Sequence, residues 1–273
     1  VVPAQQTLPD SVKSHLVLQD NNVPYHTAER LVITAGATLE IEEGVQLIIG
    51  PDIAVRIEGR LVVNGTENRP VLFTTAQEED RWRYIYSTGT LITRHLHVSN
   101  AVRFLNSYGD TVIIEHCKVE NTYGTAGDDC IGVHDAQKVL IRNNTLTGNP
   151  AAGKTDAIDL DNIFDDTISG NTISMFSDDG IDIGTRSSGI LISENTISHC
   201  EMGISVGESS TAVVHRNLIT HCLGGIQSHF GSIVEATNNT LYSNALGIRA
   251  FHNYSEETSG ETAYIFNTSI SVG

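Results

Sequence analysis

The sequence predicts an all-β protein whose chain winds into a single right-handed parallel β-helix, a solenoid of stacked coils, preceded by an N-terminal arm or cap. Two recurring motifs, and the lack of helical periodicity through them, predict this fold. One motif is a short strand that begins at a small residue, and the other is centred on asparagine. A repeat of this length buries its apolar face only by stacking on its neighbours, as the units of a solenoid do.

The strand motif alternates apolar residues with others after a small residue, as in Ala157 followed by Ile158 and Leu160. This alternation is typical of a short strand with one buried face. The motif recurs at spacings of 27, 23, 23, 22 and 22 residues, which defines six coils. Their first residues are Cys130, Ala157, Gly180, Gly203, Gly225 and Gly247.

The asparagine motif places one Asn at an equivalent point of successive coils, just before a Thr or Leu and an apolar residue. Asn tolerates left-handed backbone at bends, and its amide can hydrogen-bond to the next coil. The motif therefore predicts an asparagine ladder at a corner of the helix. Its members are Asn144, Asn171, Asn195, Asn217 and Asn239.

The repeats also set the expected domain boundaries. Residues 1–28 are polar and without a clear period, which favours an arm or cap, and residues 29–273 are expected to form one β-helix with regular coils over 128–253. The 273 residues, at roughly 20 to 29 per coil, give about nine to eleven coils. The less regular stretch 81–127 is expected to contain loops that could form the wall of a groove.

The charge of the chain limits its partners. Lys and Arg number 16 against 33 Asp and Glu, a formal net charge of −17. This argues against nucleic acid and anionic membranes and favours cations. No apolar run reaches the length of about 18 residues that a membrane span requires. The last coil still reads as strand, so further domains of the same parent chain are an expected partner.

Three of the four cysteines follow a histidine at a corresponding corner. Cys200 and Cys222 are one coil apart, about 5 Å by strand spacing, which is close enough for a disulfide. The alternative is a stack of small buried thiols. We interpret the histidines before them as corner residues.

The opening coils resemble those of secreted bacterial right-handed β-helix proteins. The resemblance rests on a GATL phrase (Gly36–Leu39), a GRL phrase (Gly59–Leu61) and the GT, P and FT positions after them. It implies the β-helix fold and a secreted or cell-surface location, and it implies no chemistry.

Carboxylates gather on the outward face of the first strand of each coil. Neighbours about 5 Å apart repel by roughly 1 kcal/mol in water-like surroundings and about 3 kcal/mol when partly buried. A bound hard cation such as Ca²⁺, or protons held at raised pKa, would offset this repulsion. A solvated acidic face without an occupant is the third interpretation. The predicted metal ligands are Asp156, Asp159, Asp161, Asp179 and Asp182.

The phrases TDAID, SDDGID and MGISVG resemble motifs of the polygalacturonase family of β-helical glycoside hydrolases. The resemblance implies that Asp156, Asp178 and Asp179 are the catalytic acid and base carboxylates. Lys154 stands where that family has Asn, and Met202 where it has His.

The same face also resembles that of β-helical polysaccharide lyases of the pectate lyase type, in which Ca²⁺ lies among Asp residues and a Lys or Arg removes a proton. His134 and His229 flank Asp161 in one outward column, where we interpret both as surface residues. The candidate substrate-binding residues are Lys154, Arg186, Glu208, His229 and Arg249.

Later phrases such as GISVGESS resemble non-catalytic β-helix modules of large secreted bacterial proteins. That resemblance implies a Ca²⁺-stabilised spacer or adhesion surface. The hypothesis favoured here is a secreted carbohydrate-active protein, with a preference for a polysaccharide-degrading hydrolase or lyase. It would act on an acidic polysaccharide through the Asp-rich groove, with Ca²⁺ as cofactor.

Overall fold

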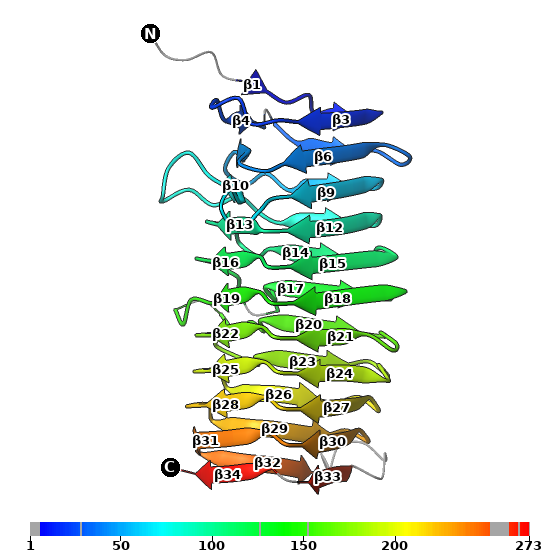
Figure 1. Ribbon diagram of the computed structural model, residues 1–273, viewed down its shortest axis with the longest axis vertical. Coiled ribbons are helices and arrows are strands. Elements are labelled where there is room, and N and C mark those ends of the chain that lie inside the picture. Colours follow the sequence, from blue (N-terminus) through cyan, green and yellow to red (C-terminus); the bar gives the residue numbers. More distant parts are fainter. Residues whose placement is uncertain are drawn as a thin grey trace.

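The chain forms one column of stacked turns built from short parallel strands (Figure 1), as seen in a computed structural model. The structure describes residues 6–27, 29–125, 127–151, 153–251, 262–266 and 268–272. Within these ranges each strand pairs in parallel with the equivalent strands of the adjacent turns, the end strands of each sheet on one side only, and there is no helix. Three sheets therefore run along the column, and each turn contributes one strand to each sheet.

Sheet 1 contains the strands that the first motif predicts, and it has 11 strands. They are β2 (Ser11–Val12), β5 (Leu31–Ile33), β8 (Val55–Ile57), β11 (Ile85–Ser87), β14 (Leu105–Ser107), β17 (Ile131–His134), β20 (Ile158–Asp161), β23 (Ile181–Gly184), β26 (Met202–Val206), β29 (Gly224–His229) and β32 (Leu246–Phe251).

Sheet 2 follows sheet 1 in every turn and also has 11 strands. They are β3 (His15–Leu18), β6 (Thr38–Glu42), β9 (Arg60–Asn64), β12 (Thr90–Arg94), β15 (Thr111–Glu115), β18 (Lys138–Arg142), β21 (Thr167–Ser169), β24 (Ile190–Ser193), β27 (Thr211–His215), β30 (Ile233–Thr237) and β33 (Thr262–Phe266).

Sheet 3 closes each turn and has 12 strands. They are β1 (Gln6–Thr7), β4 (Tyr25–His26), β7 (Gln46–Ile48), β10 (Val71–Thr74), β13 (Leu96–Ser99), β16 (Lys118–Glu120), β19 (Thr145–Thr147), β22 (Thr172–Ser174), β25 (Thr196–Ser198), β28 (Leu218–Thr220), β31 (Thr240–Asn244) and β34 (Ser269–Val272).

These sheets confirm the predicted right-handed parallel β-helix of about 11 turns. Strands β1 to β4 lie in the segment that the sequence assigned to an arm or cap. Strand β1 pairs with β4, β2 with β5 and β3 with β6, so this segment begins the three sheets. The last two residues of the predicted regular range, 252 and 253, lie outside the described residues. No helix of the described chain has the length and apolarity that crossing a bilayer demands.

The core is a continuous stack of aliphatic side chains inside the column. Alternate residues of each strand point inward, and Ile158, Leu160 and Ile181 are fully buried as the alternation predicts. Trp82 is also fully buried, and its indole N–H donates to the backbone carbonyl of Ser99 at 2.9 Å. The apolar strands thus leave only their outward residues to make a functional surface.

The predicted asparagine ladder is confirmed. Each side-chain amide N–H donates to the Oδ1 of the next coil's Asn, from Asn144 to Asn171 at 2.9 Å and onward to Asn239 at 3.0 Å. Each Oδ1 also accepts the backbone N–H of the preceding Asn. The ladder satisfies buried polar groups that would otherwise destabilise the corner.

The histidine corners and the cysteines are structural, as interpreted. His116, His199 and His221 have positive φ, and the rings of His199 and His221 stack with centroids 5.2 Å apart. The four cysteines are free and buried, which supports the buried-thiol alternative over a disulfide.

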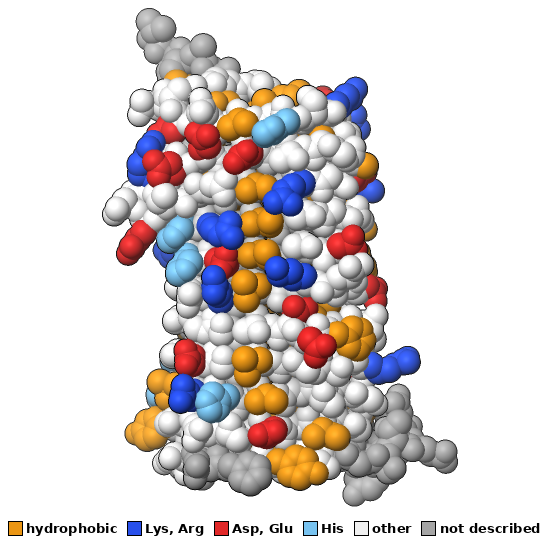
Figure 2. Space-filling model, turned by 45° about the vertical axis from the view of Figure 1, so that its right-hand side comes forward, with side chains coloured by type: hydrophobic (Ala, Val, Ile, Leu, Met, Phe, Trp, Pro, Cys, Tyr) orange, Lys and Arg blue, Asp and Glu red, His pale blue; other side chains and the backbone are white. Residues whose placement is uncertain are grey.

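Sheet 2 presents a different outer face from sheet 1. Figure 2 shows a column of hydrophobic side chains along this face, beside basic and acidic groups. The strand register places Val62, Ile92 and Ile113 in one outward line. Beside them lies the carboxylate of Glu115, which is almost completely buried and forms ion pairs with Arg94 and Arg142. The carboxylates predicted to bind a ligand lie on sheet 1 instead.

Candidate functional site

Two outward columns of sheet 1 carry the carboxylates of the candidate site. In the first column Asp159 on β20 pairs in register with Asp182 on β23, between Gly132 and Ser205. This alignment at coil spacing agrees with the sequence pattern. Asp159 and Asp182 are therefore direct cross-strand neighbours.

The second outward column runs from His134 to Asp161 and then to Gly184. In the following turns Gly207 and His229 hold the equivalent positions, because Val206 pairs with Ser228. The two glycines leave a gap in this column between the side chains of Asp161 and His229.

The gap opens into a hollow on the outer face of sheet 1. A Cβ atom on Gly184 would lie 2.7 Å from Oδ1 of Asp161, and one on Gly207 would lie 2.7 Å from Nε2 of His229. The absence of side chains at these glycines therefore creates the floor of the hollow. It is lined by Asp156, Asp159, Asp161, Asp182, Gly184, Thr185, Gly207, Glu208 and His229.

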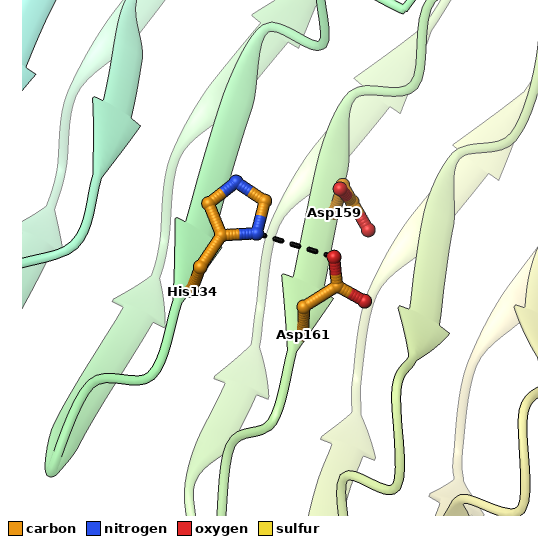
Figure 3. Close-up of side chains that lie close together, drawn as sticks. All are labelled: His134, Asp159 and Asp161. Atoms are coloured by element: carbon orange, nitrogen blue, oxygen red, sulfur yellow. Dashed lines mark hydrogen bonds and ion pairs between the residues drawn. The ribbon is translucent and has the colours of Figure 1, made fainter.

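A histidine–carboxylate pair lies at one end of the hollow (Figure 3), with the Nδ1 of His134 3.1 Å from the Oδ2 of Asp161. One face of the imidazole stacks on the ring of Tyr108, with ring centroids 4.7 Å apart. The hydrogen bond from His134 lowers the pKa of Asp161, which opposes the effect of burial. Asp161 is thus held as a carboxylate, and it fixes the imidazole with Nε2 as the second ring nitrogen.

At the other end of the hollow, His229 lies between neighbouring turns. Its Nε2 is 3.2 Å from the Ser205 hydroxyl, and its ring stacks on Phe251 with centroids 5.6 Å apart. On the side wall, the hydroxyl and the backbone N–H of Thr185 donate to Oε2 of Glu208 at 3.0 and 3.1 Å.

Behind the hollow, a column of aspartates bonds to the backbone of the next turn. Oδ1 of Asp129 accepts the N–H of Asp156 at 3.1 Å, Oδ1 of Asp156 accepts the N–H of Asp179 at 2.6 Å, and Oδ1 of Asp179 accepts the N–H of Met202 at 3.1 Å. One oxygen of each carboxylate therefore has a structural role. The second oxygen remains for a proton, a cation or a ligand.

Burial shifts the acid–base behaviour of this column. It raises the pKa of Asp156 to about 10, with a further contribution from the charges of Asp179 and Asp182. Burial likewise raises the pKa of Asp179 to about 8 and of Asp182 to about 6, and it places the pKa of Asp159 well above the ordinary value. Without a counter-ion, Asp156 and Asp179 therefore hold protons at neutral pH, next to the ionised Asp161.

The predicted catalytic carboxylates do not all reach the hollow. Asp156 lines it, whereas Asp178 lies at the preceding corner, where Nζ of Lys154 is 3.4 Å from it and 2.8 Å from Glu201. Asp179 stands beside Asp156 in the backbone-bonded column.

Two groups of the described residues could hold a metal ion, and together they contain four of the five predicted ligands, all except Asp182. One contains Asp156, Asp178 and Asp179, and the other contains His134, Asp159 and Asp161. The first offers only carboxylate oxygens, the donors that Ca²⁺ prefers, and the second mixes oxygen with an imidazole nitrogen. The chemistry of the first group therefore fits Ca²⁺ better.

Of the predicted substrate-binding residues, Glu208 and His229 line the hollow. Lys154 is at the corner already described, and Arg186 is exposed in the turn after β23. Arg249 lies beyond the end of the hollow. Its Nε donates to Oε1 of Gln227 at 3.0 Å, and its guanidinium group covers the ring of Phe251. Tyr108 was not among these candidates, and His134 was placed beside Asp161 but interpreted as a surface residue.

Comparison with known proteins supports the fold. A family model described as a right-handed β-helix region matches residues 100–263, and one described as a pectate-lyase-like β-helix domain matches residues 10–92. No curated protein matches the sequence.

Two solved structures are similar to this chain. One is an alginate lyase from Paenibacillus sp. strain FPU-7, with a TM-score of 0.54 and 15% identity, covering 86% of this chain and 93% of that one. The other is the Dettilon tailspike protein, with a TM-score of 0.35 and 14% identity, covering 89% of this chain and 62% of that one. The first likeness is one of fold.

Proposed function

Because the chain belongs to the right-handed β-helix family, and because its fold is similar to that of an alginate lyase, we propose that it binds an acidic polysaccharide and cleaves it by β-elimination at the hollow of sheet 1. The proposal includes a secreted or cell-surface location, where such a substrate is found. A fold of this kind hosts many activities, so the argument rests on the site.

The His134–Asp161 pair beside the hollow is the observation that carries the proposal. Asp161 accepts a hydrogen bond from Nδ1, so the lone pair of the neutral imidazole is on Nε2. An imidazole held in this way, with its free lone pair on Nε2, suits removal of a proton from carbon. The protonated carboxyls across the hollow supply the complementary acid.

In this reaction Nε2 of His134 takes the C5 proton of a uronate ring. The electron pair forms the C4–C5 double bond while the C4–O4 bond breaks. The leaving O4 then takes a proton from a carboxyl group, for which Asp182 is suited because burial raises its pKa to about 6. Protonated Asp156 or Asp159 can donate a hydrogen bond to the uronate carboxylate.

Ca²⁺ belongs to this proposal as a second means of neutralising charge. Asp156, Asp178 and Asp179 would hold it, and a bound divalent cation would supply electrostatic attraction for the uronate carboxylate. The carboxyls that it contacts would then be ionised.

The test is to incubate the protein with polyuronates and with a neutral glucan, following ultraviolet absorbance and new reducing ends together. The lyase proposal predicts both signals from a polyuronate and neither from the glucan. Reducing ends without absorbance would indicate a hydrolase that uses the carboxylates alone. Loss of both signals in chelator would show that the cation is required.

A non-catalytic Ca²⁺-stabilised module is the second candidate, and the bonds from the aspartate column to the backbone favour it. Those bonds give each carboxylate a role in holding one turn to the next. This candidate predicts that no product forms from the polyuronate and that the melting temperature is lower in chelator.

A further inference from the structure

In the aspartate column of sheet 1, the charge of the side chains changes from negative to positive toward the N-terminus. The residue two positions before the first core residue of each strand is Asp129, Asp156 or Asp179 in the acidic turns. In the two turns before them, the equivalent residues are Arg83 and Arg103, because Ile85 pairs with Leu105 and Leu105 with Ile131. One continuous column therefore carries arginines and then aspartates.

The two arginines share one aromatic ring. The guanidinium carbon of Arg103 lies 4.6 Å from the ring centroid of Tyr84, and that of Arg83 lies 5.7 Å from it. The backbone N–H of Arg103 also donates to the carbonyl of Arg83 at 3.1 Å. Contact with the ring face orients both cations and lowers the entropy cost of using them to bind a ligand.

These guanidinium groups have few carboxylate partners. In the described part of the chain, Arg103 has one distant ion pair, 3.6 Å from Asp128, and Arg83 has none. Arg83 is exposed, whereas Nε of Arg103 is buried without a hydrogen-bond partner. In a chain with a net charge of −17, two adjacent arginines with spare donors are a specific anion-binding feature.

A second line of stacked side chains, farther along the strands of the same turns, leads to the hollow. The guanidinium of Arg56 lies 5.4 Å from the ring of Tyr86, whose centroid is 6.2 Å from that of Tyr108, which in turn stacks on His134. Arg56 also pairs with Glu58 at 2.8 Å. Tyr108 is 48% exposed, so its ring is open to a sugar face.

We propose that Arg83, Arg103 and Tyr108 form the binding surface for the carboxylate groups and sugar rings of a linear polyuronate, which crosses these turns of sheet 1 obliquely and enters the hollow past His134. This inference rests on the proposed function, and it assigns substrate binding to the arginine turns and proton transfer to the acidic turns. Arg103 and Tyr108 lie five residues apart in one turn, at most about 17 Å along an extended chain, and His134 is on the next strand, about 5 Å farther, so one oligosaccharide of several sugars can contact both regions.

The test measures binding of a polyuronate oligosaccharide by calorimetry to the full chain and to the double variant Arg83→Gln/Arg103→Gln. The expected result is a loss of affinity of about tenfold or more for each arginine, with a reduced dependence on salt. A matched control is Arg60→Gln/Arg216→Gln, which removes the same charge from exposed positions outside sheet 1. The control is expected to change affinity less than threefold.

Tyr108→Ala is a second variant that keeps all charges, and it guards against misfolding caused by the loss of the partly buried Arg103. It is expected to weaken binding about tenfold at an unchanged melting temperature. Equal losses in the arginine variant and its control, no effect of either site variant, or equal binding of a neutral glucan would each overturn the inference. Preference for a sulfated polymer would overturn the assignment to uronates.

Cleavage by the wild type with an unchanged KM in the double variant would leave the proposed function standing while removing this inference. Arginine-dependent binding without any product would do the reverse.

Discussion

The Nδ1 of His134 lies 3.1 Å from the Oδ2 of Asp161, its direct neighbour on the next strand of sheet 1. This contact joins the two halves of one face. Toward the N-terminus lie the tyrosines and arginines, and toward the C-terminus lie the carboxylates of the hollow. The pair stands where a substrate bound by the first half would meet the acid–base groups of the second.

Replacing His134 by Gln is expected to reduce the rate of polyuronate cleavage by about 10²-fold or more, because the general base is lost. Binding of the oligosaccharide should change little. His97 provides a matched control, since its Nε2 pairs with Glu120 at 2.7 Å on sheet 3. Steady-state kinetics of both variants give the comparison, and an equal loss in His97→Gln would contradict the role of His134.

The stability of the metal-free protein is expected to decrease as pH rises. The pKa values of Asp182, Asp179 and Asp156 are raised to about 6, 8 and 10, mainly by burial. A group with a raised folded-state pKa contributes stability that is fully present below its unfolded pKa and is lost as pH rises through the folded value. Melting temperatures between about pH 5 and about pH 9 measure this decrease.

Asp156→Asn should flatten that pH dependence, because an amide oxygen can still accept the N–H of Asp179 but carries no charge. Asp52→Asn is the control, an exposed residue at positive φ that Asn also tolerates. A melting temperature that rises with pH in the wild type would refute the assignment of raised pKa values.

Adding Ca²⁺ at about 100 times its dissociation constant should stabilise the protein by about 2.7 kcal/mol, or roughly 5–10 °C in melting temperature. Asp178→Asn is expected to weaken this response, because Asp178 belongs to the all-carboxylate group. Asp52→Asn should leave it unchanged. If Ca²⁺ shifts the wild type and Asp178→Asn equally, the ion binds elsewhere.

Filling the floor of the hollow should impair the site without unfolding the sheet. An alanine at Gly207 would bring its Cβ within 2.7 Å of Nε2 of His229, so the imidazole must move. We expect about a tenfold loss of kcat/KM. An unchanged melting temperature of Gly207→Ala would show that the loss arises at the site and not from unfolding. Full activity of Gly207→Ala would place the substrate outside the hollow.

Truncating the asparagine ladder should destabilise the whole column. Asn195→Ala removes the acceptor of two buried N–H groups of Asn171, each costing about 1–3 kcal/mol when unpaired. A loss of roughly 2–5 kcal/mol is expected in denaturant unfolding. Asn64→Ala, which loses a bond to the partly exposed Glu40, should cost less than about 1 kcal/mol. A similar cost for both would argue against the ladder as a stabilising element.

The sequence alone predicts the fold because the period of the repeat and the alternation within each strand determine the register. Asp159 and Asp182 could be aligned in this way, and the structure pairs them. The column of five asparagines could be predicted equally well, because a buried side-chain amide at a corner has few hydrogen-bond partners other than the Asn of the next coil.

The composition of the site was less predictable. Asp156 and Asp179 were predicted to bind a metal or to act in catalysis, but the sequence did not show that one oxygen of each accepts a backbone N–H of the next turn. Arg83 and Arg103 lie in turns whose irregular spacing hides the register, so their place in the aspartate column emerges only from strand pairing. Contacts between turns depend on side-chain direction, which the repeat period does not encode.

The most direct measurement of the central claim is mass spectrometry of polyuronate products formed in water labelled with heavy oxygen. The account predicts unsaturated oligosaccharides without the label, formed by the wild type and strongly reduced in His134→Gln. Labelled, saturated products would contradict β-elimination and indicate hydrolysis, and a polymer left intact by the wild type would contradict cleavage altogether.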